Sequence, residues 1–169
     1  KAVASEFMDR LESGELSLRV THNDTKLNNV MIDDKTGKGI CVIDLDTIMQ
    51  GLAMNDFGDS IRFGASTAAE DEIDLTKVSC DMNLYEIYLR GFLKGCNGKL
   101  TSKEMELLPF GAKVMTFECG MRFLTDYLEG DHYFKIHREG HNLDRCRTQF
   151  KLVKDMEEKW DIMARIVRN

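Results

Sequence analysis

The sequence predicts an α+β fold, a mostly helical body that carries one small β-hairpin. Two short apolar runs, at residues 30–32 and 40–43, flank a polar turn that contains glycine, as the strands of a hairpin do. After residue 46 the apolar side chains recur at helical spacing. A hydrophobic fraction of 43% and a single proline leave room for a packed core and for long helices.

The segments before the hairpin predict a helix, a strand and a polar loop. Residues 3–11 carry apolar side chains at helical spacing, and Gly14 can end this helix in the left-handed conformation. Residues 16–20 alternate between apolar and polar, which is typical of a half-buried strand. The strand runs directly into residues 21–29, so this polar segment is expected to be a loop between two strands.

The helices after the hairpin are predicted by capping residues as well as by periodicity. We expect a short helix over residues 56–63, a solvated acidic loop over residues 65–75 and a helix that ends near Gly95. Thr101 and Glu104 have the spacing of a capping box, which predicts the start of a new helix.

Two long helices complete the predicted fold. Pro109 suits the first turn of a helix that Gly130 ends. Apolar side chains then recur on one face from residue 143 to residue 167, which predicts a single last helix. No linker rich in Gly, Ser or Pro divides the chain, so residues 1–169 are expected to form one unit.

Net charge and cysteine pattern argue against several classes of protein. The 29 acidic against 23 basic residues give a formal charge of -6, which argues against a nucleic-acid partner because phosphate contacts need a basic surface. No apolar stretch has the length of a membrane span, so no membrane partner is expected. The five cysteines form no Cys-x-x-Cys pair, which argues against a structural zinc site and indicates reduced thiols in a cytoplasmic protein.

Two polar segments at strand ends carry the residue types of a phosphoryl-transfer site. The first contains His22, Asp24 and Asn29 between two predicted strands. The second places Asp44 and Asp46 at the end of the hairpin. When the hairpin folds, the oxygen atoms of Asp24, Asn29 and Asp44 are expected to surround one small volume.

These residue types suit phosphoryl transfer, which needs in-line positioning and neutralised phosphate charge more than covalent help. Asn29 and Asp44 offer the hard oxygen ligands that Mg²⁺ prefers. Asp24 is placed to accept the proton of an attacking hydroxyl. Lys26 either contacts the transferred phosphoryl group or is a solvated loop lysine, and Asp46 either supports the metal site or orders its loop.

These segments and their flanks resemble the aminoglycoside phosphotransferase and choline kinase branch of the protein-kinase-like fold. The wider resemblance is to bacterial N-acetylhexosamine 1-kinases, and the segments that carry it are residues 20–31, 42–47, 56–65 and 122–128. It implies a protein-kinase-like C-terminal lobe whose hairpin carries the catalytic and metal loops. It also implies a sugar kinase that uses ATP and Mg²⁺ to phosphorylate the anomeric hydroxyl of N-acetylglucosamine or N-acetylgalactosamine.

The resemblance assigns roles to individual positions. Asp24 is implied as the catalytic base, with Lys26 beside it. The implied magnesium ligands are Asn29 and Asp44. His22 and Asp56 match residues that hold the catalytic loop in place.

The acceptor sugar is expected to bind Phe63, Arg122 and Tyr133, which match sugar-pocket positions of the same family. A flat pyranose ring stacks on an aromatic ring, and an arginine offers several donors to hydroxyl and acetamide oxygens. Arg122 has a second possible partner in Asp126, one helical turn later.

A kinase of this fold also needs an N-terminal lobe that covers the phosphates and reads adenine. The segment at residues 95–99 lacks the spacing of a phosphate-binding loop. We therefore expect residues 1–169 to be the C-terminal lobe alone and inactive by itself, with upstream sequence missing. Its expected partners are a small sugar, a nucleotide and the N-terminal lobe of the same protein.

Three alternatives stay open. Another small-molecule kinase of the same fold would act on a choline-type amino alcohol or on an aminoglycoside, whose positive charges require a strongly acidic pocket. A non-catalytic kinase-like binding module would be expected to lack the base or the metal ligands, yet Asp24, Asn29 and Asp44 are all present. An aspartate-nucleophile hydrolase would have to use Asp46, because neither loop contains Ser or Cys.

Overall fold

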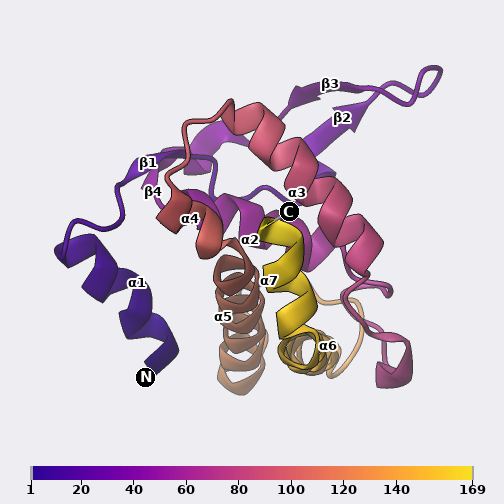
Figure 1. The fold of residues 1–169 in the computed structure, drawn as a ribbon. Coiled ribbons are helices and arrows are strands. Elements are labelled where there is room, and N and C mark those ends of the chain that lie inside the picture. The colour runs from indigo at the N-terminus through magenta and orange to yellow at the C-terminus, as the bar shows by residue number, and fades with distance from the viewer. Residues whose placement is uncertain (1, 169) are drawn as a thin grey trace.

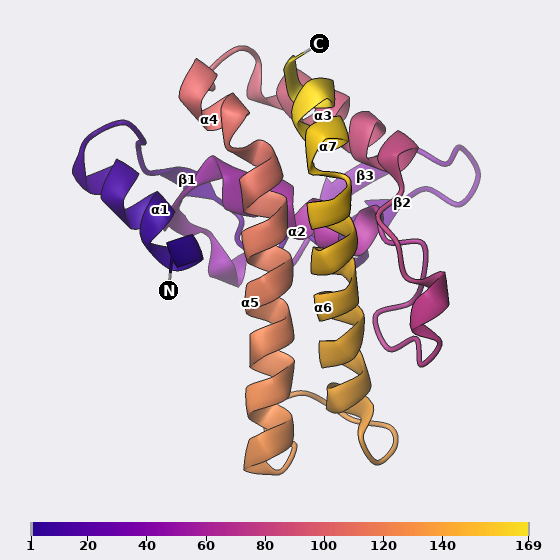
Figure 2. The same ribbon diagram turned by 60° about the horizontal axis from the view of Figure 1, so that its bottom comes forward.

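The helical part of the protein is built on two antiparallel helices and a third helix that packs across one of them. The structure is a computed structural model that describes residues 2–168. Helices α5 (Leu108–Glu129) and α6 (His141–Glu158) lie side by side and antiparallel, and α2 (Ala53–Gly64) packs across α5 (Figures 1 and 2). Within the described part of the chain, no helix is both long and apolar enough to cross a membrane.

The β region consists of two separate antiparallel ribbons. Strands β2 (Val30–Ile32) and β3 (Gly39–Val42) form the predicted hairpin, which projects from the helical body in Figure 1. Strand β1 (Arg19–Thr21) pairs with β4 (Met49–Gly51). The mostly helical α+β fold is therefore confirmed, but the prediction that only helices follow residue 46 is wrong, because a three-residue strand is too short to show a period and β4 exists through its pairing with β1.

Four further helices complete the fold of residues 2–168. These are α1 (Ala2–Glu12), α3 (Met82–Cys96), α4 (Ser102–Glu106) and α7 (Trp160–Arg168). Thr101 and Glu104 form the predicted capping box at the start of α4, and Gly130 ends α5 with φ 101°. Short 3-10 turns at Leu27–Asn29, Leu45–Thr47 and Leu75–Lys77 connect the elements.

The prediction of a single last helix from residue 143 to residue 167 is wrong, because the helix is interrupted at Lys159, between α6 and α7. The Lys159 ammonium donates to Ser79 Oγ at 2.6 Å, to the Cys80 carbonyl at 2.9 Å and to Asp155 Oδ2 at 2.7 Å. Two of these three acceptors lie on a segment some 80 residues away, so the apolar period of the helices does not reveal the break.

The core lies where α2, α5 and α6 meet. Its fully buried side chains come from all three helices and are Met54, Phe57, Ile61, Leu108, Ala112, Leu152 and Met156. Glycines make the closest crossing possible. A Cβ added to Gly58 would lie 2.4 Å from the Gly111 carbonyl oxygen, and one added to Gly111 would lie 2.3 Å from the Met54 carbonyl oxygen. The backbones of α2 and α5 therefore touch, which holds α2 at a fixed depth in the body.

Replacing Gly58 by alanine should therefore destabilise the fold by about 1–3 kcal/mol, because the new methyl group meets backbone that cannot yield. Urea unfolding of Gly58→Ala measures this. Gly95→Ala is the matched control, since Gly95 also lies in a helix but has open space around it. The control should gain about 0.5–1 kcal/mol from helix propensity. Equal stabilisation of both variants would contradict the proposed contact between α2 and α5.

Candidate active site

A loop from residue 22 to residue 26 follows β1, and α2 holds its backbone in place. The Asp56 carboxylate accepts the backbone N–H of His22 at 2.9 Å and that of Asn23 at 2.8 Å. The Thr25 hydroxyl donates to the Asp56 carbonyl at 2.5 Å. Burial raises the pKa of the Asp56 carboxyl, and the two backbone donors oppose that rise. The loop therefore takes its position from the first turn of α2.

His22 connects this loop to the end of the hairpin. Its Nε2 lies 3.1 Å from the Ile43 carbonyl oxygen, and its Nδ1 faces the Asp24 backbone N–H at 3.3 Å. Because a carbonyl can only accept, the ring proton belongs on Nε2. The Thr47 hydroxyl donates to the His22 carbonyl at 2.6 Å. Two segments that are separate in the sequence are thus joined from both sides.

The Asp24 carboxylate is held by two neighbours on its own loop. Its Oδ2 lies 2.8 Å from Lys26 Nζ and 2.7 Å from Asn29 Nδ2. Partial burial opposes ionisation, but the bonds from Lys26 and Asn29 outweigh it and lower the pKa of Asp24 below its ordinary value. Asp24 is therefore an ionised carboxylate, as a proton acceptor must be.

Asn29 and Asp44 offer oxygen ligands that suit Mg²⁺. The Asn29 amide nitrogen donates to the carbonyl and the carboxylate of Asp24, so its amide oxygen remains available. Asp44 is exposed in the left-handed conformation (φ 62°, ψ 57°), and its carboxylate has no hydrogen bond or ion pair to any residue from 2 to 168. The Ile43 backbone N–H donates to the Asn29 carbonyl at 2.9 Å, which brings the two segments together.

This donor set fits a Mg²⁺ ion that keeps several water or substrate oxygens. Magnesium is commonly bound through one or two carboxylates, with the remaining positions filled from outside the protein. No cluster of three or more His, Cys, Asp or Glu side chains is present over residues 2–168 to enclose a metal completely. An ion held by Asn29 and Asp44 would therefore be open to substrate.

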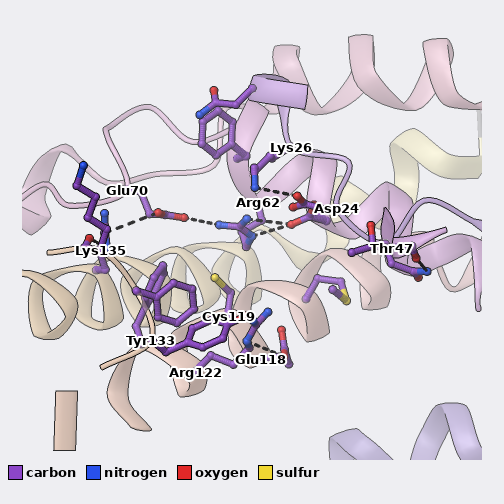
Figure 3. Close-up of a pocket in the computed structure, with 18 of the residues that line it drawn as sticks. Asp24, Lys26, Thr47, Arg62, Glu70, Glu118, Cys119, Arg122, Tyr133 and Lys135 are labelled. Carbon is purple, nitrogen blue, oxygen red and sulfur yellow. Dashed lines mark hydrogen bonds and ion pairs between the residues drawn. The ribbon is translucent and has the colours of Figure 1, made fainter. Parts of the chain in front are cut away.

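A cavity of about 520 Å³ brings the predicted base and the predicted acceptor positions together (Figure 3). The predicted residues that line it are Asp24, Lys26, Phe63, Arg122 and Tyr133. Asn29 and Asp44 do not line it. Asn29 borders a second, mainly apolar cavity of about 540 Å³ between the loop, the hairpin and α3.

Arg122 and Tyr133 are in contact at one wall of the cavity (Figure 3). Arg122 Nη2 donates to the Tyr133 hydroxyl at 3.4 Å, and Arg122 Nε lies 3.7 Å from Glu118. The alternative pairing of Arg122 with Asp126 is wrong. Asp126 instead accepts the backbone N–H groups of the loop that carries Tyr133, namely those of His132, Tyr133 and Phe134.

Sequence analysis missed a buried charged group in the same cavity. Arg62 donates from Nε and Nη2 to Asp59 Oδ1 at 3.0 and 2.9 Å, and from Nη1 to Glu70 Oε1 at 2.6 Å. Although burial alone would lower it, neighbouring negative charges hold the pKa of Arg62 above its usual value. Glu70 is therefore not part of a purely solvated acidic loop. The available signal was an Asp and an Arg three residues apart on a helix that is otherwise largely apolar.

Comparison with known protein families identifies the family of the chain. Residues 1–91, more than half of the chain, match the model of the phosphotransferase enzyme family, abbreviated APH. The chain belongs to the phosphotransferase enzyme family. A phosphotransferase of the kinase-like kind is thus confirmed. The matched region contains Asp24, Asn29, Asp44 and Asp56, whereas Arg122 and Tyr133 lie outside it.

Replacing Lys26 by methionine should raise the pKa of the Asp24 carboxyl, because it removes the neighbouring cation. The Asp24 pKa is depressed in the folded protein. Asp24 therefore contributes stability that is present above the unfolded pKa, about 4, and is lost as the pH falls through the folded pKa. Lys26→Met should shrink this contribution at neutral pH.

A carboxyl-carbon NMR titration of Asp24 measures the pKa directly. Lys35→Met is the control, because Lys35 is an exposed lysine of the hairpin turn. An unchanged Asp24 pKa in Lys26→Met would show that the ion pair at 2.8 Å does not control this carboxyl.

Proposed function

We propose that this chain is the catalytic lobe of an ATP- and Mg²⁺-dependent kinase that phosphorylates the anomeric hydroxyl of an N-acetylhexosamine in the cytoplasm. One observation carries the proposal: Asp24 shares a cavity with Phe63, Arg122 and Tyr133, the three positions expected to bind the sugar. Family membership supports the phosphotransferase chemistry. The residues that line the cavity support a sugar as the acceptor.

Asp24 acts as the general base in this proposal. Its carboxylate takes the proton of the anomeric hydroxyl as that oxygen attacks the γ-phosphorus, and the bond from phosphorus to the leaving ADP oxygen breaks. Asp56 accepts the His22 backbone N–H, and the His22 ring accepts the Asp24 backbone N–H, which fixes the position of Asp24. Lys26 places a positive charge beside the attacking oxygen. Mg²⁺, when held by Asn29 and Asp44, would neutralise charge on the phosphates.

The charges of the cavity favour a neutral acceptor over a polycation. Its acidic side chains are nearly matched by basic ones, the former being Asp24, Asp59, Glu70 and Glu118 and the latter Lys26, Arg62, Arg122, Lys135 and Arg145. An aminoglycoside would meet five cationic and four anionic side chains there. A sugar can stack on the rings of Phe63 and Tyr133 and bind the polar groups between them.

The β region supports a covering N-terminal lobe with the nucleotide beneath it. Large apolar side chains are exposed on the strands, among them Val20 (82% exposed), Ile40 (62%) and Met49 (57%). Large exposed apolar side chains on neighbouring strands are a common feature of interaction surfaces. We propose that residues 1–169 form one lobe and that the strands face the nucleotide-binding lobe of the same protein.

An acceptor panel tests the substrate class. With MgATP, the full-length protein should phosphorylate N-acetylglucosamine or N-acetylgalactosamine at the anomeric oxygen, and residues 1–169 alone should be inactive. Phosphate transfer is followed by coupled ADP release and by NMR of the product. Transfer to choline or kanamycin with none to N-acetylhexosamines would reject the substrate assignment.

Asp24→Asn should lower kcat by about 10²- to 10⁴-fold, because it removes the general base and preserves the shape of the side chain. Asp34→Asn is the matched control, since Asp34 is an exposed aspartate of the hairpin turn. The control should retain wild-type kcat and the same Mg²⁺ requirement. Wild-type kcat in Asp24→Asn would reject the catalytic role of this residue.

A further inference from the structure

One face of α2 carries, at successive turns, a side chain that binds the neighbouring loop and two that line the cavity. Asp56 holds the catalytic loop, Asp59 follows three residues later, and Phe63 follows Asp59 by four. Residues at these spacings lie above one another on a helix, with a rise of about 1.5 Å per residue. Asp59 and Phe63 both line the cavity that contains Asp24. Asp59 thus lies on α2 between Asp56, which binds the backbone of the loop, and the ring of Phe63.

Asp59 has an oxygen without a partner. The residue is only 6% exposed, and its Oδ1 accepts both bonds from Arg62. Its Oδ2 is buried and accepts no hydrogen bond from residues 2–168. A buried carboxylate oxygen without a donor is costly, because it has lost its water. A buried acceptor of this kind, on a residue that lines the cavity, can be satisfied by a donor from outside the chain.

We propose that Asp59 Oδ2 accepts a hydrogen bond from a second hydroxyl of the acceptor, one that is not phosphorylated. Asp59 is then a specificity-determining residue of the acceptor site. The inference rests on the proposed function in one respect, that a hydroxylated acceptor occupies this cavity. It does not require that acceptor to be an N-acetylhexosamine.

The surroundings of Asp59 select a neutral hydroxyl over an ammonium group. Arg62 lies between Asp59 and Glu70, and Arg145 Nε lies 3.9 Å from Glu70, so the two arginines together balance the two carboxylates. Little net attraction for a cation remains, whereas the lone pairs of Oδ2 are unused. Arg62 is itself held by Glu70 at 2.6 Å, so the carboxylate has a fixed orientation. A fixed acceptor favours the substrate stereoisomer whose hydroxyl reaches it, and a polar site of this kind discriminates strongly against an analogue that lacks the group.

Asp59→Asn tests the proposal in the full-length enzyme. The amide oxygen can still accept from Arg62, but an amide nitrogen replaces Oδ2 and turns the acceptor into a donor. We expect kcat/KM for the acceptor to fall by about 10- to 100-fold, mainly through KM, with the KM for ATP unchanged. Wild-type enzyme should lose a similar factor with one monodeoxy analogue of its best acceptor, and Asp59→Asn should lose nothing further with that analogue.

Glu70→Gln is the matched control, because it also removes a carboxylate from Arg62 while leaving Asp59 Oδ2 intact. Its losses should be the same for the parent acceptor and for every deoxy analogue. The proposal fails if Asp59→Asn keeps the wild-type dependence on each hydroxyl, or if Glu70→Gln abolishes the dependence on the same hydroxyl.

A second measurement needs no variant. The carboxyl-carbon NMR signal of Asp59 in the wild-type enzyme should shift when the parent acceptor is added, and should not shift with the critical deoxy analogue. A signal that both or neither of them moves would overturn the inference. The proposed function fails separately, when the best acceptor of the panel is not an N-acetylhexosamine. The Asp59 pattern would then be read with that other acceptor and its deoxy forms.

Discussion

The candidate site depends on two hydrogen bonds that one partly buried carboxylate accepts from backbone N–H groups. Asp56 holds the N–H groups of His22 and Asn23, and Asn23 takes a positive φ of 63° where the chain turns toward Asp24. Asp56 lies in the first turn of α2, and α2 touches α5 backbone to backbone at Gly58. The position of the loop at residues 22–26 therefore follows from the packing of the helical core and not from the loop's own sequence.

The cavity next to this loop is polar but nearly neutral, because its charges occur in pairs. Lys26 lies against Asp24, and Arg62 lies between Asp59 and Glu70. Paired charges produce little net field, so they attract neither a polycation nor a polyanion. They do present fixed donors and acceptors at defined places. Such a surface suits a neutral ligand with several hydroxyl groups, as the proposed sugar acceptor has.

The residues proposed for the chemistry and those proposed for acceptor recognition come from different parts of the chain. The family match ends at residue 91 and includes Asp24, whereas the opposite wall is formed by Arg122 and Tyr133. Asp126 fixes that wall by accepting three backbone N–H groups from the loop that carries Tyr133. The proposed acceptor wall is thus anchored to α5, separately from the loop at residues 22–26.

The sequence by itself determined what depends on near neighbours. The capping box at Thr101, the glycine stop at Gly130 and the hairpin are set by residues within a few positions, so local patterns predicted them. The polar segment around Asp24 was recognisable because its residue types and spacing suit one chemistry. Only the tertiary structure decided the strand β4, the interruption of the last helix at Lys159 and the ion pair of Glu70 with Arg62 in the cavity. Each of these depends on a partner from a different element, and no local period or motif records which distant group a side chain will meet.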